Sequence, residues 1–493
     1  MLRSRTIICV LGVVFAAGVH AATPPAKVAV CTACHGPELN GGKGMYPRIA
    51  GQPEEYLYFQ LQNFHRGIRK NPLMSPVATG LSDAEMRQLA AYLSALHPPF
   101  AEQTAAKPTA AELERGRELA TVGNWSRGVP ACDSCHASDL EGVASSIPAL
   151  AGQPVQYLVT VLQQLQALPE SADYPLALAT MHKVSRGLTA NDIKAVAAYI
   201  GTLKQGERVA AVKPAFNKAY RPAAQSPDKF TPPPLDAMPS GPDGEAVWQG
   251  LQLMQHTHTL AKSHVGNDLN CVNCHVDQGR QAGSAPMWAA YIAYPKYRSK
   301  NRKVNTLEER IQGCFTYSMN GKPPAADSPE MKSLVTYFHW LATGLPVGIT
   351  PKGAGYPKLA AAPKPASIAR GKQVFAANCA MCHGDDGQGR VARRAQVFPP
   401  LWGPRSFNWG AGMSKISTAA AFVHANMPYG DGRRLTLQEA WDVAAYLDSY
   451  PRPQDPRFTG SVEQTRQKYH ARDSYYGRTV NGQLLGAPEP RKR

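Results

Sequence analysis

Four stretches of the chain repeat one pattern of apolar and polar residues. In each stretch apolar residues recur every three or four positions, which predicts an amphipathic helix. Each also carries a tyrosine near the same place: Tyr92, Tyr199, Tyr337 and Tyr446. The stretches are Leu81 to Leu96, Leu188 to Leu203, Ser328 to Gly344 and Leu435 to Tyr450. Ser82 and Thr189 precede acidic first turns and are typical N-caps. The pattern therefore predicts four modules that end in the same kind of helix.

The first two modules are close repeats. The string IAGQPEEYLYFQLQNF from Ile49 matches LAGQPVQYLVTVLQQL from Leu150, at an offset of 101 residues. Self-similarity at a fixed offset indicates a repeated structural unit. In the fourth module an opening helix is also clear, where Gly371 and Phe375 precede a cysteine motif. The chain thus predicts a tandem pair of modules followed by two further ones.

The cysteines explain what each module is built around. Eight of the ten cysteines form four copies of a Cys-x-x-Cys-His motif. They are Cys31/Cys34 with His35, Cys132/Cys135 with His136, Cys271/Cys274 with His275, and Cys379/Cys382 with His383. This motif is typical of c-type haem attachment, where the thiols bind the haem covalently and the histidine binds iron. We therefore expect four covalently bound haem c groups and an all-α fold of four class I cytochrome c-type modules.

A proline follows each motif and is expected to hold the histidine ring. In small cytochromes c, which each module resembles, a proline carbonyl accepts the Nδ1–H of the haem histidine and fixes its orientation. The prolines are Pro47, Pro148, Pro286 and Pro400. In the same resemblance most apolar residues pack on the haem, which makes the haem part of the core of each module.

The amino terminus predicts export. Arg3 and Arg5 precede an apolar run from Thr6 to Val19, which is short for a membrane span and ends in small residues. We expect residues 1–22 to be a Sec signal peptide, whose cleavage removes Cys9. The mature protein is then expected in the periplasm, without stable membrane insertion. The formal charge of +17 favours anionic partners. Because no helix-turn-helix or zinc-finger pattern accompanies it, no nucleic-acid partner is expected.

Composition places the boundaries between the modules. Residues 212–243 and 351–365 are rich in proline, which favours extended linkers, and the residues after Pro451 are polar. We divide the chain into a signal peptide (1–22), module one (23–105), module two (106–205), a Pro-rich linker (206–243), module three (244–350), a second linker (351–366), module four (367–452) and a polar tail (453–493). The tail is expected to be a solvated or wrapping arm.

Methionines are expected opposite the histidine in three modules. A thioether ligand raises the haem potential and suits electron transfer. Met74 and Met181 lie in strings that share Met, Val, Gly and Leu at the same spacing, and Met427 precedes a proline shortly before the last helix. Met86 as a packing residue and His182 as a competing ligand remain alternatives.

Module three departs from this pattern. Met319 has the spacing of the missing ligand, but Cys314, the spare thiol of the mature chain, lies five residues earlier. The residue spacing leaves Cys314 and Met319 as rivals, with His256, His258 and His264 as outsiders. Basic residues crowd this part of the chain: Lys296, Arg298, Lys300, Arg302, Lys303 and Arg310. Positive charge stabilises a thiolate and attracts anions.

The segment from Val265 to Pro324, with its CVNCH motif and the string IQGCFTYSMNGKPP, resembles the catalytic haem domain of thiosulfate dehydrogenases. With module four the resemblance covers roughly residues 244–451. It implies oxidation of two thiosulfates to tetrathionate, with His275 and Cys314 as haem ligands. It further implies that Arg298, Arg310 and Ser318 contact the substrate. Some members carry lysine where this chain has Asn426, so steady His383/Met427 ligation is expected in module four.

The amino-terminal pair resembles the di-haem cytochrome that accepts this enzyme's electrons, here fused to it. The fusion implies a further periplasmic acceptor downstream, either a small redox protein or a terminal oxidase. The reverse reaction, tetrathionate reduction, is the same chemistry. The rivals are an electron carrier without its own substrate, another sulfur-oxidising haem enzyme, and a haem peroxidase. The carrier would require Met319 on the third iron.

Overall fold

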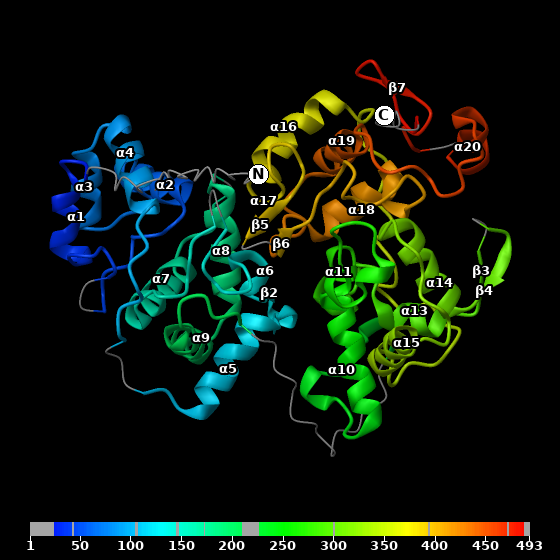
Figure 1. Ribbon diagram of the computed structural model, residues 1–493, viewed down its shortest axis with the longest axis horizontal. Coiled ribbons are helices and arrows are strands. Elements are labelled where there is room, and N and C mark those ends of the chain that lie inside the picture. Colours follow the sequence, from blue (N-terminus) through cyan, green and yellow to red (C-terminus); the bar gives the residue numbers. More distant parts are fainter. Residues whose placement is uncertain are drawn as a thin grey trace, which may run out of the picture.

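The computed structural model describes residues 24–41, 44–103, 107–143, 147–171, 173–209, 226–298, 301–392, 395–470 and 473–487 (Figure 1). The signal segment with Cys9, Lys300, the middle of the first linker and the end of the tail lie outside these ranges. The described chain is mainly helical, with short two-stranded antiparallel ribbons. None of its helices is long and apolar enough to span a membrane. The expected all-α class is confirmed, and the ribbons are additions to it.

Modules one and two form the half of the molecule that runs from blue through cyan to teal-green in Figure 1. Module one contains α1 (Val28–His35), α2 (Glu54–His65), α3 (Met74–Thr79) and α4 (Asp83–Ser94). Module two contains α5 (Ala110–Thr121), β1 (Gly123–Asn124), η1 (Trp125–Arg127), β2 (Val129–Pro130), α6 (Asp133–His136), α7 (Val155–Gln166), α8 (Leu176–Gly187) and α9 (Ala190–Thr202). Ser82 and Thr189 cap α4 and α9 in capping boxes, as their sequence context predicts.

The repeated Gly-Gln-Pro strings hold these two modules together. Gln52 exchanges two hydrogen bonds of 2.9 Å with the backbone of Ala149. Gln153 does the same with the backbone of Arg48, at 3.0 and 2.8 Å. Both glutamines are buried, so each side-chain amide satisfies a backbone donor and acceptor of the opposite repeat. The duplication therefore produces a reciprocal interface.

Modules three and four form the other half of the molecule (Figure 1). Module three contains α10 (Pro242–Gln255), α11 (Thr257–Leu260), η4 (Lys262–His264), η5 (Cys271–Asn273), α12 (Val276–Gly279), α13 (Met287–Ala293), β3 (Lys296–Arg298), β4 (Lys303–Asn305), α14 (Leu307–Gly313), the π-helix η6 (Cys314–Ser318) and α15 (Pro329–Leu341). Module four contains α16 (Ile368–Asn378), α17 (Ala380–His383), β5 (Arg390–Ala392), β6 (Ala395–Phe398), η7 (Gly412–Ser414), α18 (Ile416–Asn426) and α19 (Leu437–Asp448).

A glycine lets the opening and closing helices cross closely in modules two, three and four. A Cβ built on Gly371 of α16 would lie 2.0 Å from the carbonyl oxygen of Asp442 and 2.7 Å from the Cβ of Tyr446 in α19. Gly116 and Gly250 meet α9 and α15 in the same way, with Tyr199 and Tyr337 as the matching tyrosines. The tyrosine shared by the four closing helices therefore marks a helix crossing in these three modules.

The first linker, expected to be extended, and the tail, expected to be a solvated or wrapping arm, both contain folded elements where the structure describes them. In the first linker, η2 (Pro227–Lys229) and η3 (Leu235–Ala237) lead to Met238, which is buried, and the ring of Phe230 packs 5.1 Å from that of Trp288. After Pro451 the chain forms α20 (Val462–Tyr469) and a ribbon of β7 (Thr479–Val480) and β8 (Gln483–Leu484). Isolated apolar residues among prolines and charges supply these contacts, which a composition average does not reveal.

Candidate haem and substrate site

Each cysteine motif places its histidine against a backbone carbonyl. The Nδ1–H of His35 donates to Pro47 and that of His136 to Pro148, both at 2.8 Å. Because a carbonyl only accepts, Nδ1 carries the proton and Nε2 is left to bind a metal. The expectation of a proline acceptor holds in these two modules.

The acceptors in modules three and four differ from the prediction by one residue. His275 donates to Ala285 at 2.8 Å rather than to Pro286, and His383 to Pro399 at 2.9 Å rather than to Pro400. In module four the N–H of Leu401, two residues beyond the acceptor, closes the loop on Gly387, as Ile49 does on Leu39 in module one. The backbone register, and not the identity of the proline, selects the carbonyl.

The thiols fit covalent haem attachment. All nine cysteines in the described residues are free, including both members of every motif pair. A motif pair without a disulfide beside an oriented histidine is the donor set that haem c requires. We find this set in each of the four modules, so the residues present fit the cofactor.

The attachment thiols differ in their exposure. The side chain of Cys34 is exposed, whereas the other seven motif thiols are half-buried. In modules two, three and four an opening helix precedes the motif and crosses the closing helix. In module one α1 itself carries the motif, and within residues 24–41 no helix precedes it. A thioether needs the sulfur only at the haem edge, and Cys34 therefore stays a predicted attachment residue beside the buried His35.

The methionines expected opposite the histidines lie in partly buried positions. Met74 begins α3, Met181 lies within α8, and Met427 directly follows α18. Of the alternatives, Met86 is buried in the apolar cluster of module one. The Nδ1–H of His182 donates to the Leu165 carbonyl at 2.7 Å, which orients that ring toward α7.

Local structure places Cys314 beside a cation. Thr306 and Glu309 form a capping box that begins α14, and this helix continues into the π-helix η6 at Cys314. Arg310 lies one helical turn before Cys314, and its guanidinium donates a hydrogen bond to the sulfur. The distance from Nη1 to Sγ is 2.9 Å. π-Helical turns occur frequently at functional sites. The four-residue spacing at the end of α14 therefore brings together the thiol and an arginine that the sequence singled out.

The same sulfur lies against His275. Burial raises the pKa of the Cys314 thiol, but Arg310 and contact with His275 lower it by more than this. The net effect is a pKa of about 6, below the ordinary value of a thiol. By contrast, burial raises the pKa of the attachment thiols Cys271 and Cys274 to about 12. Cys314 is thus set apart from the neighbouring cysteines by its cationic surroundings.

Arg298, at the end of β3, lies near the same sulfur and near Arg310. Burial lowers its pKa, repulsion by Arg310 adds to this, and Tyr294 and Cys314 act in the opposite direction. The other basic residues that the structure describes here are exposed: Lys296, Arg302 and Lys303, the last of which bonds to Glu309 at 2.7 Å. Ser318 ends the π-helix, and its carbonyl accepts a bond of 2.8 Å from Asn267. The crowded basic stretch therefore contributes two arginines near Cys314, Arg298 and Arg310.

The rivals of Cys314 make other contacts. Met319 is 3 % exposed and packs in the apolar core of module three. The Nδ1–H of His258 donates to Asn267 at 2.7 Å, and that of His264 donates to Lys322 at 3.0 Å. Burial lowers the pKa of His256.

Two features of the site were missed by sequence reasoning. Tyr356, in the second linker, donates to the Cys274 carbonyl at 3.1 Å and packs on Phe422 of module four. Arg457, in the polar tail, lies 5.1 Å from the ring centre of Tyr317 in the π-helix and binds the buried Asp455 at 2.6 Å. No local motif marks either contact, because each joins residues far apart in sequence.

Comparison with known proteins agrees with this geometry. The cytochrome c family model matches residues 26–97, 113–204 and 368–451, and the SoxA/TsdA cytochrome c domain model matches residues 260–347. A thiosulfate dehydrogenase from Thiomonas intermedia is 53% identical over 267 residues, which cover 53% of this chain and 85% of that protein. A thiosulfate dehydrogenase electron acceptor from the same organism is 39% identical over 204 residues, covering 40% of this chain and 90% of that protein.

One solved structure resembles nearly the whole chain. It is a thiosulfate dehydrogenase (TsdBA) from Marichromatium purpuratum, with a TM-score of 0.80 and 43% identity, covering 93% of this chain and 95% of that one. The fold and the attachment motifs define a multi-haem c-type cytochrome. Within that class the chain belongs to the thiosulfate dehydrogenase family, with a region that is similar to the family's electron acceptor.

Proposed function

We propose that the chain oxidises two thiosulfate ions to tetrathionate in module three and passes the electrons to its own amino-terminal modules. The observation that carries this proposal is the Cys314 sulfur, bonded to Arg310 at 2.9 Å and lying against His275. His275 and Cys314 would ligate one haem. The pairs His35/Met74, His136/Met181 and His383/Met427 would ligate three others, giving four covalently bound haem c groups.

The arginines would bind and orient the substrate. Thiosulfate is a dianion, and two of them must approach each other for a sulfur–sulfur bond to form. Arg298 and Arg310 offer guanidinium donors to the sulfonate oxygens and offset their repulsion, and Ser318 adds a hydroxyl. Holding both ions in one pocket also converts an encounter of three bodies into a local reaction.

The Cys314 sulfur has two possible roles that keep the atoms balanced. In one it remains a ligand, and two bound thiosulfates join through their outer sulfurs with loss of two electrons. In the other it bonds to the outer sulfur of the first thiosulfate as two electrons leave. The second thiosulfate then attacks that sulfur, forms tetrathionate and releases the Cys314 thiolate. The haem groups supply the electron acceptors for either role.

The electrons would pass from module three to module four and then to modules one and two. Contacts support the first transfer: Tyr356 bridges Cys274 and Phe422, and the Gln281 amide donates to Asn426 at 3.3 Å. Asn426 occupies the place where some family members carry lysine, so no exchange of ligands is expected in module four. A downstream acceptor, a small redox protein or a terminal oxidase, would receive the electrons in the periplasm after export through residues 1–22.

The test replaces Cys314 by glycine in the full-length protein that retains its haems. We expect loss of thiosulfate-dependent haem reduction and a changed ligand signature in the electron paramagnetic resonance spectrum of one haem, with the others unaltered. Met319→Leu is the matched control, because it alters the rival ligand at the end of the same turn. Full activity of Cys314→Gly, or loss of the ligand signature in Met319→Leu, would refute the assignment.

A further inference from the structure

Modules two and four meet through the segments that carry their proposed methionine ligands. Residues 427–434 of module four, which we term the docking loop, begin with Met427. They lie against helix α8 of module two. A Cβ built on Gly430 of this loop would lie 3.4 Å from Pro130 and 3.6 Å from Val184. The Tyr429 ring meets the Trp125 ring edge-on at 5.1 Å. The loop is therefore packed closely on module two.

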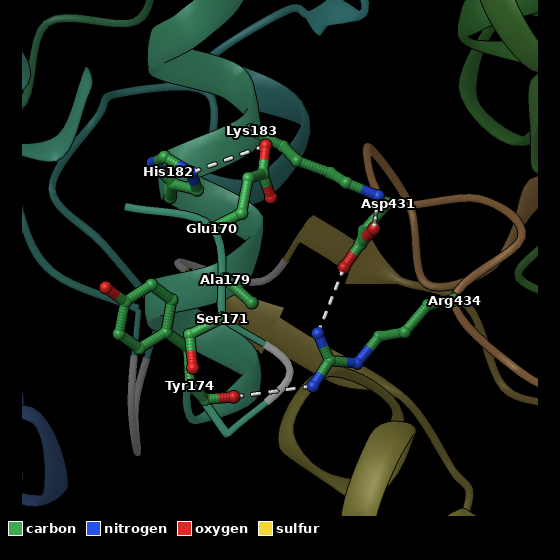
Figure 2. A pocket seen from close by; sticks show the side chains of 8 residues that line it. All are labelled: Glu170, Ser171, Tyr174, Ala179, His182, Lys183, Asp431 and Arg434. Carbon is green, nitrogen blue, oxygen red and sulfur yellow. Dashed lines mark hydrogen bonds and ion pairs between the residues drawn. The ribbon is translucent and has the colours of Figure 1, made fainter. Parts of the chain in front are cut away.

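Asp431 is the charged centre of this contact (Figure 2). Its side chain is 2 % exposed, and the ammonium group of Lys183 on α8 donates to one carboxylate oxygen. Arg434 donates to the other oxygen at 3.3 Å and to the Tyr174 carbonyl of module two at 3.4 Å. The backbone N–H of Asp431 donates to Pro428 at 2.8 Å, which fixes the loop beneath the carboxylate. The side chains of Lys183, Asp431 and Arg434 line a cavity of about 300 Å³ at the junction, together with Tyr174.

The junction also brings two haem-attachment motifs together. Cys135 of module two and Cys382 of module four pack on one apolar cluster, whose buried members are Ala137, Val143 and Phe398. Burial raises the pKa of the Cys135 thiol, and the neighbouring Cys382 adds to this, which places the two sulfurs in one environment. The approach of these modules is therefore set close to where both cofactors would be attached.

We propose that Asp431 is a positioning residue for electron transfer from module four to module two. Its carboxylate binds Lys183 of one module and Arg434 of the other, and so fixes the docking loop against α8. One electron leaves module four for each electron that module two gains, and no bond or proton is exchanged. The inference rests on the proposed function for the source of the electrons, while the docking itself does not depend on thiosulfate.

Loss of the carboxylate should open the junction. Asp431→Asn leaves Lys183 and Arg434 as two cations that face each other without an anion between them. Removing one member of a buried ion pair destabilises strongly, because the remaining charge stays desolvated. Since Lys183 is 48% exposed, we expect a smaller effect than for a fully buried pair.

The experiment measures redistribution of electrons within the full-length holoprotein after pulse radiolysis, which reduces the haems without thiosulfate. In Asp431→Asn we expect transfer between the two halves to slow by about fivefold or more, with haem potentials unchanged. Lys183→Met should slow it less, since the Asp431–Arg434 pair remains. The double variant should be no slower than Asp431→Asn, because both changes remove one interaction. Lys204→Met, an exposed lysine of module two, is the control.

Each outcome decides the matter. Asp431→Glu should restore most of the rate, because it returns the negative charge. An unchanged rate in both Asp431→Asn and Lys183→Met overturns the inference, and so does a slowed rate that accompanies a shifted potential. If Asp431→Asn does not fold, Lys183→Met carries the test. Because the radiolytic reductant replaces the substrate, a chain that failed to oxidise thiosulfate would refute the proposed function and leave this test intact.

Discussion

Replacing Arg310 by glutamine tests the chemistry of the pocket most directly. The change keeps a polar side chain of moderate length but removes the positive charge that lies 2.9 Å from the Cys314 sulfur. A hydrogen bond to a charged group contributes about 1.5–3 kcal/mol, and we take the lower end because Arg310 is half-buried. About 1.4 kcal/mol corresponds to tenfold, so loss of the bond to Cys314 alone should lower kcat/KM for thiosulfate about tenfold.

The substrate adds a second contribution. If Arg310 also binds a sulfonate oxygen, as we propose, the two lost interactions together give a decrease of about 100-fold. The assay is steady-state oxidation of thiosulfate with a soluble electron acceptor, with haem content measured for each preparation. Arg302→Gln is the matched control, because Arg302 is an exposed arginine of the same module. It lies at the turn between β3 and β4. Arg310→Gln with kcat/KM within twofold of the original protein would refute this account of the pocket.

Two further predictions concern stability. Gly371→Ala should destabilise module four by about 1–3 kcal/mol in calorimetric unfolding, because its Cβ would lie 2.0 Å from the Asp442 carbonyl. Gly412→Ala, where a Cβ meets nothing within 4 Å, is the control, and equal stability of the two variants would contradict the packing argument. The second prediction concerns acid: bonds from Lys303, Asn305 and Thr306 lower the pKa of Glu309 to about 2. A depressed carboxyl stabilises the folded form above its unfolded pKa of about 4.3 and loses this as pH falls toward 2. The protection factor of the amides at the start of α14, which corrects for the intrinsic pH dependence of exchange, should therefore fall over that range, and Glu309→Gln should remove this fall; an unchanged profile in that variant would show that another group is responsible.

The repeated parts of the fold were predictable because short-range patterns encode them. The closing helix α4 was expected from the apolar spacing and the Ser82 cap, and the structure places it within one turn of the predicted limits. The motif histidines and the all-α class followed from the cysteine spacing in the same way. Each of these features depends on residues within about twenty positions of one another.

Contacts between distant segments were not predictable from local pattern. The acceptor carbonyls of His275 and His383 depend on backbone register, so a rule based on proline was wrong by one residue in both. The ion pair between Lys183 and Asp431 joins positions 248 residues apart, and neither residue stands out in its local sequence.

The difference in surroundings between Cys314 and Met319 also needed three-dimensional structure, because residue spacing left both as candidate ligands. Met319 lies in the apolar core, where a thioether is ordinary packing. Cys314 lies against a guanidinium and an imidazole that come from different parts of module three. The sequence showed the abundance of basic residues, and the fold selected which of them reach the sulfur.

The folded tail has a practical consequence for anyone who trims this protein. The family match to module four stops at residue 451, which invites a truncation there. Such a cut would remove Arg457 from the face of Tyr317 and uncover Trp409, whose ring packs 5.7 Å from that of Tyr476. The shortened chain would keep every recognised motif. It would lose the contact of Arg457 with the π-helix that begins at Cys314.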